Sequence, residues 1–286
     1  VYGRLTGKAG VCLSTLGPGA TNLMTGIADA NMDGAPLVAI TGQASRDRMH
    51  KESHQHIDVV DTFRSITKWN AQVRTGVIIP EIVRKAFKVA ETEKPGATHI
   101  DLPEDIAEEE VDTDPLLRQS PYPSEPLSAQ MDRAAKCISA AKSPIILAGN
   151  GVVRQGAASA VTRFAEKLNI PVAETFMGKG VLRDDHPLSL LTCGLQARDY
   201  VSCGFDRADV VIAVGYDLVE YAPERWNPNS DKTIIHIDML PAEVDQHYII
   251  GVGVLGDITT SLDRLAERVD PCHHNNYSLG LRELIL

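Results

Sequence analysis

The chain has no long apolar run, few aromatic residues and no excess of basic charge. No stretch approaches the roughly 18 consecutive apolar residues of a membrane span. Phe, Tyr and Trp make up only 5% of the 286 residues, and 28 Lys and Arg stand against 38 Asp and Glu, for a net charge of −10. These features argue against a membrane protein and against a surface that binds nucleic acid or anionic lipid.

Cysteine is also scarce, and its pattern predicts neither disulfides nor a metal site. The Cys272-His273-His274 run lies in a polar segment without a second pair of ligands, whereas zinc sites need four ligands at set spacing. The sequence begins at Val1 without an initiator Met and shows no signal peptide, so it reads as starting within a longer polypeptide. A reduced, cytoplasmic protein is expected from five scattered cysteines, which are Cys12, Cys137, Cys193, Cys203 and Cys272.

The first residues predict a strand, a glycine turn and a helix. The apolar run from Ala9 to Leu13 favours a buried strand, and Gly17-Pro18-Gly19 ends it, because Pro18 fixes φ and glycine adopts backbone angles closed to other residues. A helix is expected from Ala20 to Met32 on its apolar spacing. Such a turn aims free helix N–H groups at whatever lies above the strand end, although an ordinary strand-to-helix turn is the competing interpretation.

A second buried strand, Ala35 to Gly42, extends this unit to the strand–helix–strand order of a parallel sheet. Ligands of such sheets lie at the carboxyl ends of the strands, where Gly17 and Gly42 are both expected. An amphipathic helix from Ile78 to Glu91 and a strand from Ala97 to Leu102 follow.

Prolines and polar residues between Asp112 and Pro126 predict a linker, placed at 114–127 after a first domain at 1–113. A second domain at 128–270 alternates predicted helices and strands, and 271–286 is expected to be a tail leading to a further domain. The fold class is therefore α/β, with two doubly wound parallel-sheet domains. The elements expected in the second domain are helices at 128–141, with Ser128 as N-cap, and 157–168, and strands at 144–149, 171–175, 208–215 and 232–238.

The Gly149-Asn150-Gly151 turn is similar to a dinucleotide-binding loop. The next glycine, Gly156, comes too late for G-x-G-x-x-G, so a generic glycine turn explains the run equally well. The other candidates for a nucleotide pocket are Gly215, Asp238 and Asp257. Arg154 and His236 could contact a phosphate or a ribose, although ordinary surface positions explain both equally well.

Several short motifs occur in a single order along nearly the whole chain. They are Leu16–Asn22 (LGPGATN), Pro36–Gln43 (PLVAITGQ), Ser65–Lys68 (SITK), Pro95-Gly96 followed by Ile100–Pro103 (IDLP), Gly149–Gly151 and Gly256-Asp257. In this order the chain resembles the acetolactate synthase branch of the thiamine-diphosphate enzymes. Members of that family have pyrimidine-binding, central and pyrophosphate-binding domains, and the resemblance implies most of the first, all of the second and none of the third.

Two runs and one lysine differ from the biosynthetic, FAD-binding enzymes of this branch, and the two runs resemble the catabolic, FAD-independent enzymes. His54-Gln55-His56 stands where the biosynthetic enzymes have Phe-Gln-Glu, and Tyr216–Tyr221 stands where they have Arg-Phe-Asp-Asp-Arg. Lys94 replaces the arginine that FAD-binding relatives carry. These departures argue against FAD and leave it only as an alternative.

The resemblance implies a carboligation. A thiamine ylid attacks pyruvate or another 2-oxo acid, CO2 leaves, and the carbanion adds to a second 2-oxo acid. By resemblance Gln55 and Lys68 line the substrate side, where Gln55 offers an amide to a developing oxyanion and Lys68 a charge to a carboxylate. A solvent-facing lysine beside a strand is the competing interpretation of Lys68. The wall of the thiamine site would be formed by Gly17, Pro18, Gly19 and Asn22.

Two catalytic parts of the family are not found in the sequence. The glutamate that protonates the aminopyrimidine is expected before Val1, and Gly256-Asp257 is followed by Ile258 rather than by the Gly of the Mg2+-binding motif. The 286 residues alone are therefore expected to be inactive, with thiamine diphosphate, Mg2+ and a homodimer or tetramer belonging to the full-length parent. The alternatives are a pyruvate oxidase or a glyoxylate or sulfoacetaldehyde carboligase, a nucleotide-binding or regulatory module, and an oligomerisation scaffold.

Overall fold

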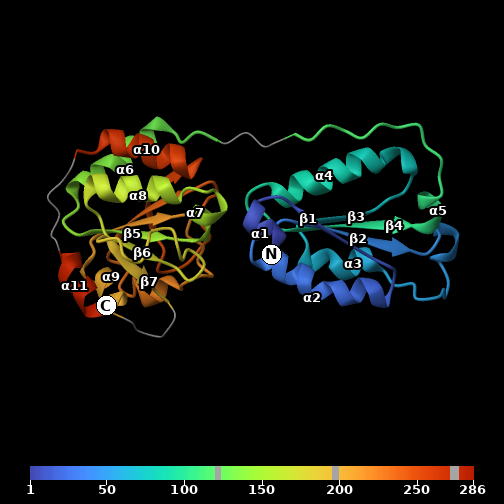
Figure 1. The fold of residues 1–286 in the computed structure, drawn as a ribbon, viewed down its shortest axis with the longest axis horizontal. Coiled ribbons are helices and arrows are strands. Elements are labelled where there is room, and N and C mark those ends of the chain that lie inside the picture. Colours follow the sequence, from blue (N-terminus) through green and yellow to red (C-terminus); the bar gives the residue numbers. More distant parts are fainter. Residues whose placement is uncertain (120–123, 195–199, 271–276) are drawn as a thin grey trace. The chain divides into compact units, whose positions relative to one another are not determined.

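The computed structural model describes residues 1–119, 124–194, 200–270 and 277–286. Contacts divide the chain into two compact units, Val1–Tyr122 and Pro123–Leu286, and this division falls inside the predicted linker. Each unit contains one sheet whose paired strands all run parallel, with helices between them (Figure 1). The α/β class, with two parallel-sheet units, is confirmed.

The first unit is built on a four-stranded sheet in the order β1-β2-β4-β3. The register sets Ser14 beside Thr41, Thr41 beside Asp101, and Asp101 beside Gln72, so four polar residues form one row across the sheet near its carboxyl edge. The strands are β1 (Gly10–Ser14), β2 (Leu37–Gln43), β3 (Trp69–Gln72) and β4 (Ala97–Pro103).

Helices cover both faces of this sheet (Figure 1). α2 (Pro18–Met32) and α3 (Val59–Phe63) pack on one face through a core that includes Ile27 and Phe63. α4 (Ile79–Glu91) packs on the other. Shorter elements are α1 (Tyr2–Thr6), α5 (Glu104–Ala107) and 3-10 turns at Arg46–Arg48, Arg64–Ile66 and Gly76–Ile78.

The predicted elements of the first unit are present with small shifts, but β1 is not the buried strand that was expected. It stands at one end of the strand order, and its Val11 and Leu13 side chains are exposed. α2 begins at Pro18 rather than Ala20, because proline is well suited to the first helical position. β3 was not predicted, since its four residues, Trp-Asn-Ala-Gln, contain neither an apolar run nor a clear alternation.

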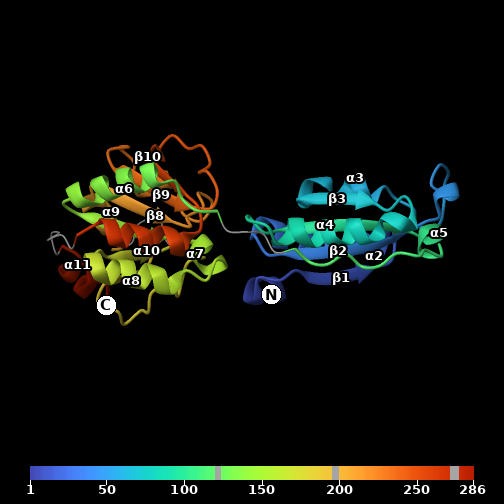
Figure 2. The same cartoon turned by 90° about the horizontal axis from the view of Figure 1, so that it is seen from above.

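The second unit has a six-stranded sheet in the order β10-β9-β8-β5-β6-β7. Figure 2 shows β8, β9 and β10 side by side. Its first strand, β5, lies between β6 and β8, so the chain reverses its direction of winding between β5 and β8. Ligands of such sheets bind outside the carboxyl ends of the strands at this point. The strands are β5 (Pro144–Ala148), β6 (Val172–Glu174), β7 (Ser189–Thr192), β8 (Val210–Val214), β9 (Thr233–Asp238) and β10 (Ile250–Leu255).

Helices also lie on both faces of the second sheet (Figure 1). α6 (Ser128–Ala140), α8 (Ala158–Leu168) and α10 (Ile258–Arg268) cover one face. α9 (Ser202–Arg207) and α11 (Tyr277–Ile285) cover the other face, so the described part of the segment expected to be a tail packs as a helix on this unit. The remaining elements are α7 (Asn150–Arg154) and a 3-10 turn at Pro223–Arg225.

One capping prediction for this unit is wrong. Leu127, not Ser128, is the N-cap of α6, because the Leu127 carbonyl already accepts from the N–H groups of Gln130 and Met131. β10 was missed because Gly251 and Gly253 interrupt its apolar pattern. Within the described ranges, no helix is both long enough and apolar enough to span a bilayer.

Candidate functional site

The glycine turn after β1 meets the chain at Gln55. Gly17 has φ 55° and Gln55 has φ 56°, so two residues with left-handed backbone lie against each other. A Cβ atom on Gly17 would lie 2.4 Å from the Gln55 carbonyl oxygen and 2.9 Å from its Cβ. Only glycine therefore fits at position 17. This backbone conformation costs a non-glycine residue such as Gln55 about 1–3 kcal/mol, and residues held in such conformations cluster at functional sites.

Beside this contact, the carboxyl edge of the sheet contains a hollow of about 420 Å3. Leu16, Gln43 and Leu102 line it from the strand ends, and Ser53 and His54 line it from the loop that carries Gln55. Arg46 holds the start of this loop, because its Nε donates to Asp105 Oδ2 at 2.6 Å. The volume is in the range of pockets that take small molecules.

A buried polar network forms the floor under this edge. Thr41 Oγ1 donates to Asp101 Oδ1 at 3.2 Å and lies 2.9 Å from His99 Nε2, while Gln72 Nε2 donates to Asp101 Oδ2 at 2.8 Å. Since the Thr41 proton is used on Asp101, His99 must donate from Nε2. Burial lowers the pKa of His99 to about 4 and raises the pKa of Asp101. His99 is therefore neutral, and its ring stacks on Phe63 with centroids 4.4 Å apart.

Gln43 joins this floor to the loop that carries Gln55. Its Oε1 accepts from His56 Nδ1 at 2.8 Å, and its Nε2 donates to the Ile57 carbonyl at 3.0 Å. Both partners directly follow Gln55 in the chain, and Gln43 is 4% exposed. The positive φ of Gln55 is thus held by bonds to a buried strand residue.

The structure does not bring Lys68 to this edge. Lys68 directly precedes β3, and its Nζ donates to three backbone carbonyls at the end of α4, those of Val89 (2.7 Å), Thr92 (2.7 Å) and Lys94 (2.6 Å). Its partial desolvation lowers the pKa of its ammonium. The seven-residue strand β4 separates the two edges by about 20 Å, so this placement favours a structural role over one beside Gln55.

The predicted thiamine-wall residues lie partly together. Pro18 occupies the first turn of α2, directly after Gly17, and the N–H of Gly19 donates to the Leu16 carbonyl at 3.2 Å. A Cβ on Gly19 would lie 2.5 Å from Ser14 Oγ, so the turn packs against its own strand. Asn22 is exposed one turn further along α2.

In the second unit, Gly149, Gly151 and Gly215 pack on one another at the switch point between β5 and β8. A Cβ on Gly149 would lie 2.4 Å from the Gly215 carbonyl oxygen, and a Cβ on Gly151 would lie 2.6 Å from the Gly215 Cα. The three glycines are needed for close approach of two backbones. This requirement explains them without a nucleotide.

A carboxylate of the chain occupies the start of α7. Both Glu220 oxygens accept from the Asn150 N–H at 3.1 Å, and the group also accepts from the Asp217 N–H and the Thr175 hydroxyl. Burial raises the pKa of Glu220 to about 7. Because Glu220 already fills this position, the Gly149–Gly151 turn does not fit a flavin or nucleotide phosphate at the Asn150 N–H.

The other residues suggested for this pocket have partners within the chain. Arg154 pairs with Asp217 at 3.3 Å, and buried His236 lies 3.0 Å from both the Tyr248 hydroxyl and the Leu240 carbonyl. Asp257 is the N-cap of α10. Buried Asp238 accepts from the Leu240 N–H at 3.1 Å, and burial raises its pKa.

Sequence reasoning did not single out the Thr41–His99–Asp101 network or the bonds of Glu220. The available signal for the network was that His99 and Asp101, two residues apart in a predicted strand, point to the same face of the sheet. No group of three His, Cys, Asp or Glu suited to a metal occurs in the described ranges. Cys272-His273-His274 lies outside those ranges.

Comparison with known proteins assigns both units to one enzyme family. Residues 1–62 match the family described as "Thiamine pyrophosphate enzyme, N-terminal TPP binding domain", and residues 131–265 match "Thiamine pyrophosphate enzyme, central domain". The two matched segments fall in the first and second units respectively.

The chain is also similar to curated acetolactate synthases. It is 39% identical to a probable acetolactate synthase large subunit of Methanococcus aeolicus over 283 residues, which cover 94% of this chain and 46% of the relative. It is 36% identical to an acetolactate synthase of Bacillus subtilis over 269 residues (92% and 46%). It is 36% identical to a catabolic acetolactate synthase of Raoultella terrigena over 273 residues (94% and 48%). The chain spans about half the length of the curated relatives it matches.

Proposed function

Because this chain belongs to the thiamine pyrophosphate enzymes, we propose that it forms part of an acetolactate synthase, which condenses two pyruvates to 2-acetolactate with loss of CO2. The observation that carries the proposal is the strained Gln55 held against Gly17 at the carboxyl edge of the unit that matches the N-terminal TPP binding domain. Similarity to several acetolactate synthases over more than 90% of the chain favours this member of the family.

Thiamine diphosphate, when bound, supplies the nucleophilic carbon and the electron sink for decarboxylation and carboligation. The residues at the carboxyl edge fit one wall of such a site. The Gly17–Gly19 turn brings backbone to the edge without bulky side chains, and the hollow beside it has a volume of about 420 Å3. The exposed amide of Gln55 can donate to the carboxylate or the developing oxyanion of a 2-oxo acid.

The network below this wall sets its geometry. Gln43 fixes the two residues after Gln55, and Arg46 fixes the beginning of the same loop. Since His99 is neutral and buried, it contributes shape rather than charge to the floor. These residues position Gln55 and do not themselves touch substrate.

We assign different roles to the other predicted groups. Lys68 stabilises the end of α4, and the Gly149–Gly151 turn packs two strands together without holding a flavin. Mg2+ and the diphosphate are proposed to be held by groups outside these two units. A cytoplasmic homo-oligomer acting on pyruvate is the corresponding working hypothesis.

The test compares the 286-residue chain with the full-length protein that its gene encodes. With thiamine diphosphate, Mg2+ and pyruvate, the chain alone is expected to form no acetolactate, whereas the full-length protein is expected to form it. In the full-length protein, Gln55→Ala is expected to lower kcat/KM about 100-fold, the usual effect of losing an oxyanion donor. A full-length protein that prefers glyoxylate, or that oxidises pyruvate, would assign the chain to another branch of the superfamily.

A nucleotide-binding module is the alternative from a different class. Isothermal titration of the chain with ADP and with FAD distinguishes this module from part of a thiamine enzyme. Glu220 accepts from the Asn150 N–H, which a nucleotide phosphate would otherwise use. No binding is expected from either titrant. Micromolar binding of either, together with no thiamine chemistry in the full-length protein, would favour the module.

A further inference from the structure

The hollow at the carboxyl edge of the first sheet contains a cation that is not used within the chain. Arg48 lines this hollow, and in the part of the chain that the structure describes no carboxylate lies at ion-pair distance from its guanidinium. Leu16 and His54 also line the hollow. They directly precede Gly17 and Gln55, the two residues that meet at this edge. Arg48 therefore lies where a 2-oxo acid would bind beside Gln55.

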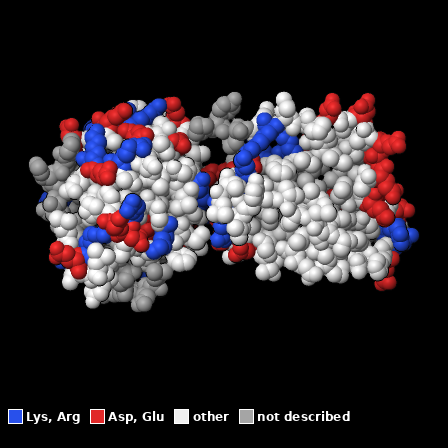
Figure 3. Space-filling model, in the orientation of Figure 1, with Lys and Arg blue, Asp and Glu red and all other residues white. Residues whose placement is uncertain are grey.

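Two arginines of the same 3-10 turn differ in their contacts. Arg46 Nε donates to Asp105 Oδ2 at 2.6 Å, and its Nη2 donates to Glu109 at 3.2 Å, so the charge of Arg46 is used inside the chain. Acidic side chains gather at this end of the unit, around α5 (Figure 3). Glu104 also lines the hollow, but among the described residues it forms no ion pair with Arg48. The guanidinium of Arg48 is therefore available to an anion that enters the hollow.

The backbone that carries Arg48 is tied to the floor of the hollow. The Arg48 carbonyl accepts from the Ser53 hydroxyl at 2.8 Å, which closes the loop between these two lining residues. The Sδ of the next residue, Met49, accepts from Gln72 Nε2 at 3.6 Å, and the same nitrogen donates to Asp101 in the buried network. A long side chain on a fixed backbone costs less entropy to order when a ligand binds.

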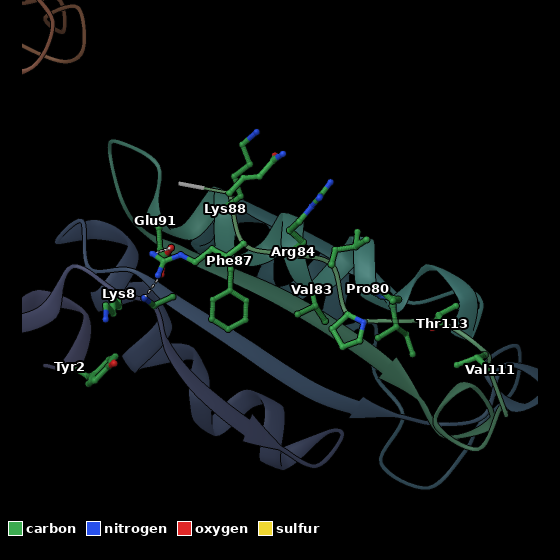
Figure 4. Close-up of a pocket in the computed structure, with 16 residues that line it drawn as sticks. Tyr2, Lys8, Pro80, Val83, Arg84, Phe87, Lys88, Glu91, Val111 and Thr113 are labelled. Atoms are coloured by element: carbon green, nitrogen blue, oxygen red, sulfur yellow. Dashed lines mark hydrogen bonds and ion pairs between the residues drawn. The ribbon is translucent and has the colours of Figure 1, made fainter. Parts of the chain in front are cut away.

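The lining of this hollow comes from residues 16–107. A larger hollow of about 660 Å3, beside α4 in the same unit, includes Tyr2 and Lys8 from the start of the sequence in its lining (Figure 4). Its shape therefore depends on any segment that precedes Val1, and the described residues do not define what occupies it.

From the arrangement at the carboxyl edge we propose that Arg48 binds the carboxylate of the second 2-oxo acid, the acceptor of the carboligation. This assignment rests on the proposed function, because it names a residue that recognises a substrate of that reaction. A planar guanidinium donates two parallel hydrogen bonds to a carboxylate, so arginine suits this class of ligand. Lys68, the cation expected on the substrate side, instead binds the carbonyls at the end of α4.

The two 2-oxo acids differ in what happens to their carboxylates. The first carboxylate leaves as neutral CO2, whereas the second is retained in 2-acetolactate. An arginine paired with the first carboxylate would stabilise the ground state and lose its partner in the transition state, which slows the reaction. A pair with the second carboxylate persists while the new C–C bond forms. The charge of Arg48 is therefore better suited to the acceptor.

The experiment lets two acceptors compete in the full-length protein that the gene encodes, with thiamine diphosphate and Mg2+ present. Pyruvate is the donor and the charged acceptor, and 13C-labelled acetaldehyde is the acceptor without a carboxylate. Addition to pyruvate gives 2-acetolactate and addition to acetaldehyde gives labelled acetoin, each with release of one CO2 and uptake of one proton. Arg48→Gln is expected to lower the ratio of 2-acetolactate to labelled acetoin about tenfold, because a charge-assisted hydrogen bond on a solvent-open side chain is lost.

Two further variants control for charge and for position. Arg48→Lys keeps the charge but not the fork of donors, so the ratio is expected to fall by at most about threefold. Lys51→Gln removes an exposed cation of the same loop that does not line the hollow, and it should leave the ratio unchanged.

An unchanged ratio in Arg48→Gln, or an equal fall in Lys51→Gln, would overturn the assignment. Loss of both products in Arg48→Gln, with the circular dichroism of the unsubstituted protein, would place Arg48 in the first step and overturn it too. If the unsubstituted full-length protein forms no 2-acetolactate, the proposed function itself fails. Formation of 2-acetolactate with a ratio insensitive to Arg48 rejects only the role of this residue.

Discussion

Gly17 and Gln55 meet with left-handed backbone on both sides of the contact, at φ 55° and 56°. The carbonyl of Gln55 occupies the space where any other residue at position 17 would place its Cβ. The glycine of the first turn is thus required by a residue 38 positions later (55 − 17). The same contact fixes the part of the loop on which Gln55 is presented.

Gly17→Ala is expected to destabilise the chain by about 2–4 kcal/mol, because it adds both a left-handed alanine and a backbone clash. Urea unfolding followed by circular dichroism measures this change. Gly26→Ala is the control, since Gly26 lies within α2 and a Cβ there meets nothing within 4 Å. That variant should be stabilised by up to about 1 kcal/mol. Equal stability of the two variants would mean that the Gly17 contact is not tight.

Thr41→Val tests the buried network. Valine has the same shape but removes the hydroxyl that joins His99 to Asp101, and leaves one atom of each without a partner. The expected loss is about 2–4 kcal/mol of unfolding free energy, at 1–3 kcal/mol for each unsatisfied buried group. Thr98→Val provides the comparison. Thr98 is equally buried, but its hydroxyl donates only to the Ala86 and Leu37 carbonyls, so this variant should lose about 1 kcal/mol of unfolding free energy. A larger loss for Thr98→Val would contradict the assigned role of Thr41.

Glu220 predicts a pH dependence of stability in the second unit. Burial raises its pKa from 4.5 to about 7, so between these values the folded chain retains a proton that the unfolded chain has released. The contribution to stability is fully present below pH 4.5 and is lost as pH rises through 7. It amounts to about 3 kcal/mol, because one pKa unit corresponds to ~1.4 kcal/mol.

Glu220→Gln removes this titration. The difference in unfolding free energy between the chain and the variant is expected to shift by about 3 kcal/mol from pH 4 to pH 8, with the variant gaining at the higher pH. Taking the difference cancels the titration of groups that both proteins share. A pH-independent difference would show that the pKa of Glu220 is not raised in the fold.

Lys68→Met is expected to lower stability by about 1–2 kcal/mol, since three carbonyls at the end of α4 lose a charged donor that is partly open to solvent. In the full-length protein kcat should change by less than twofold. Lys136→Met, on an exposed position of α6, should be neutral within about 0.5 kcal/mol. A large fall in kcat with unchanged stability would restore Lys68 to the substrate side.

Strongly apolar elements could be predicted from the sequence, and mixed ones could not. The runs that became β5 and β8 are almost entirely Val, Ile, Leu and Ala, as are the first four residues of β2, so burial on both faces of a parallel sheet leaves a clear local pattern. β3 and β10 contain polar residues or glycine, and only pairing with a neighbouring strand holds them in the sheet. The local sequence pattern does not show which strands pair.

The sequence by itself determined the α/β class, the two-part organisation and the family, because these depend on local apolar periodicity and on motifs that lie in a fixed order. Only the tertiary structure decided which motif residues share a site. It joined Gly17 to Gln55, sent Lys68 to the opposite edge of the sheet, and placed Glu220 on the Asn150 N–H. The physical reason is that strand order and register set distances between residues far apart in the chain, and neither can be read from a residue and its near neighbours.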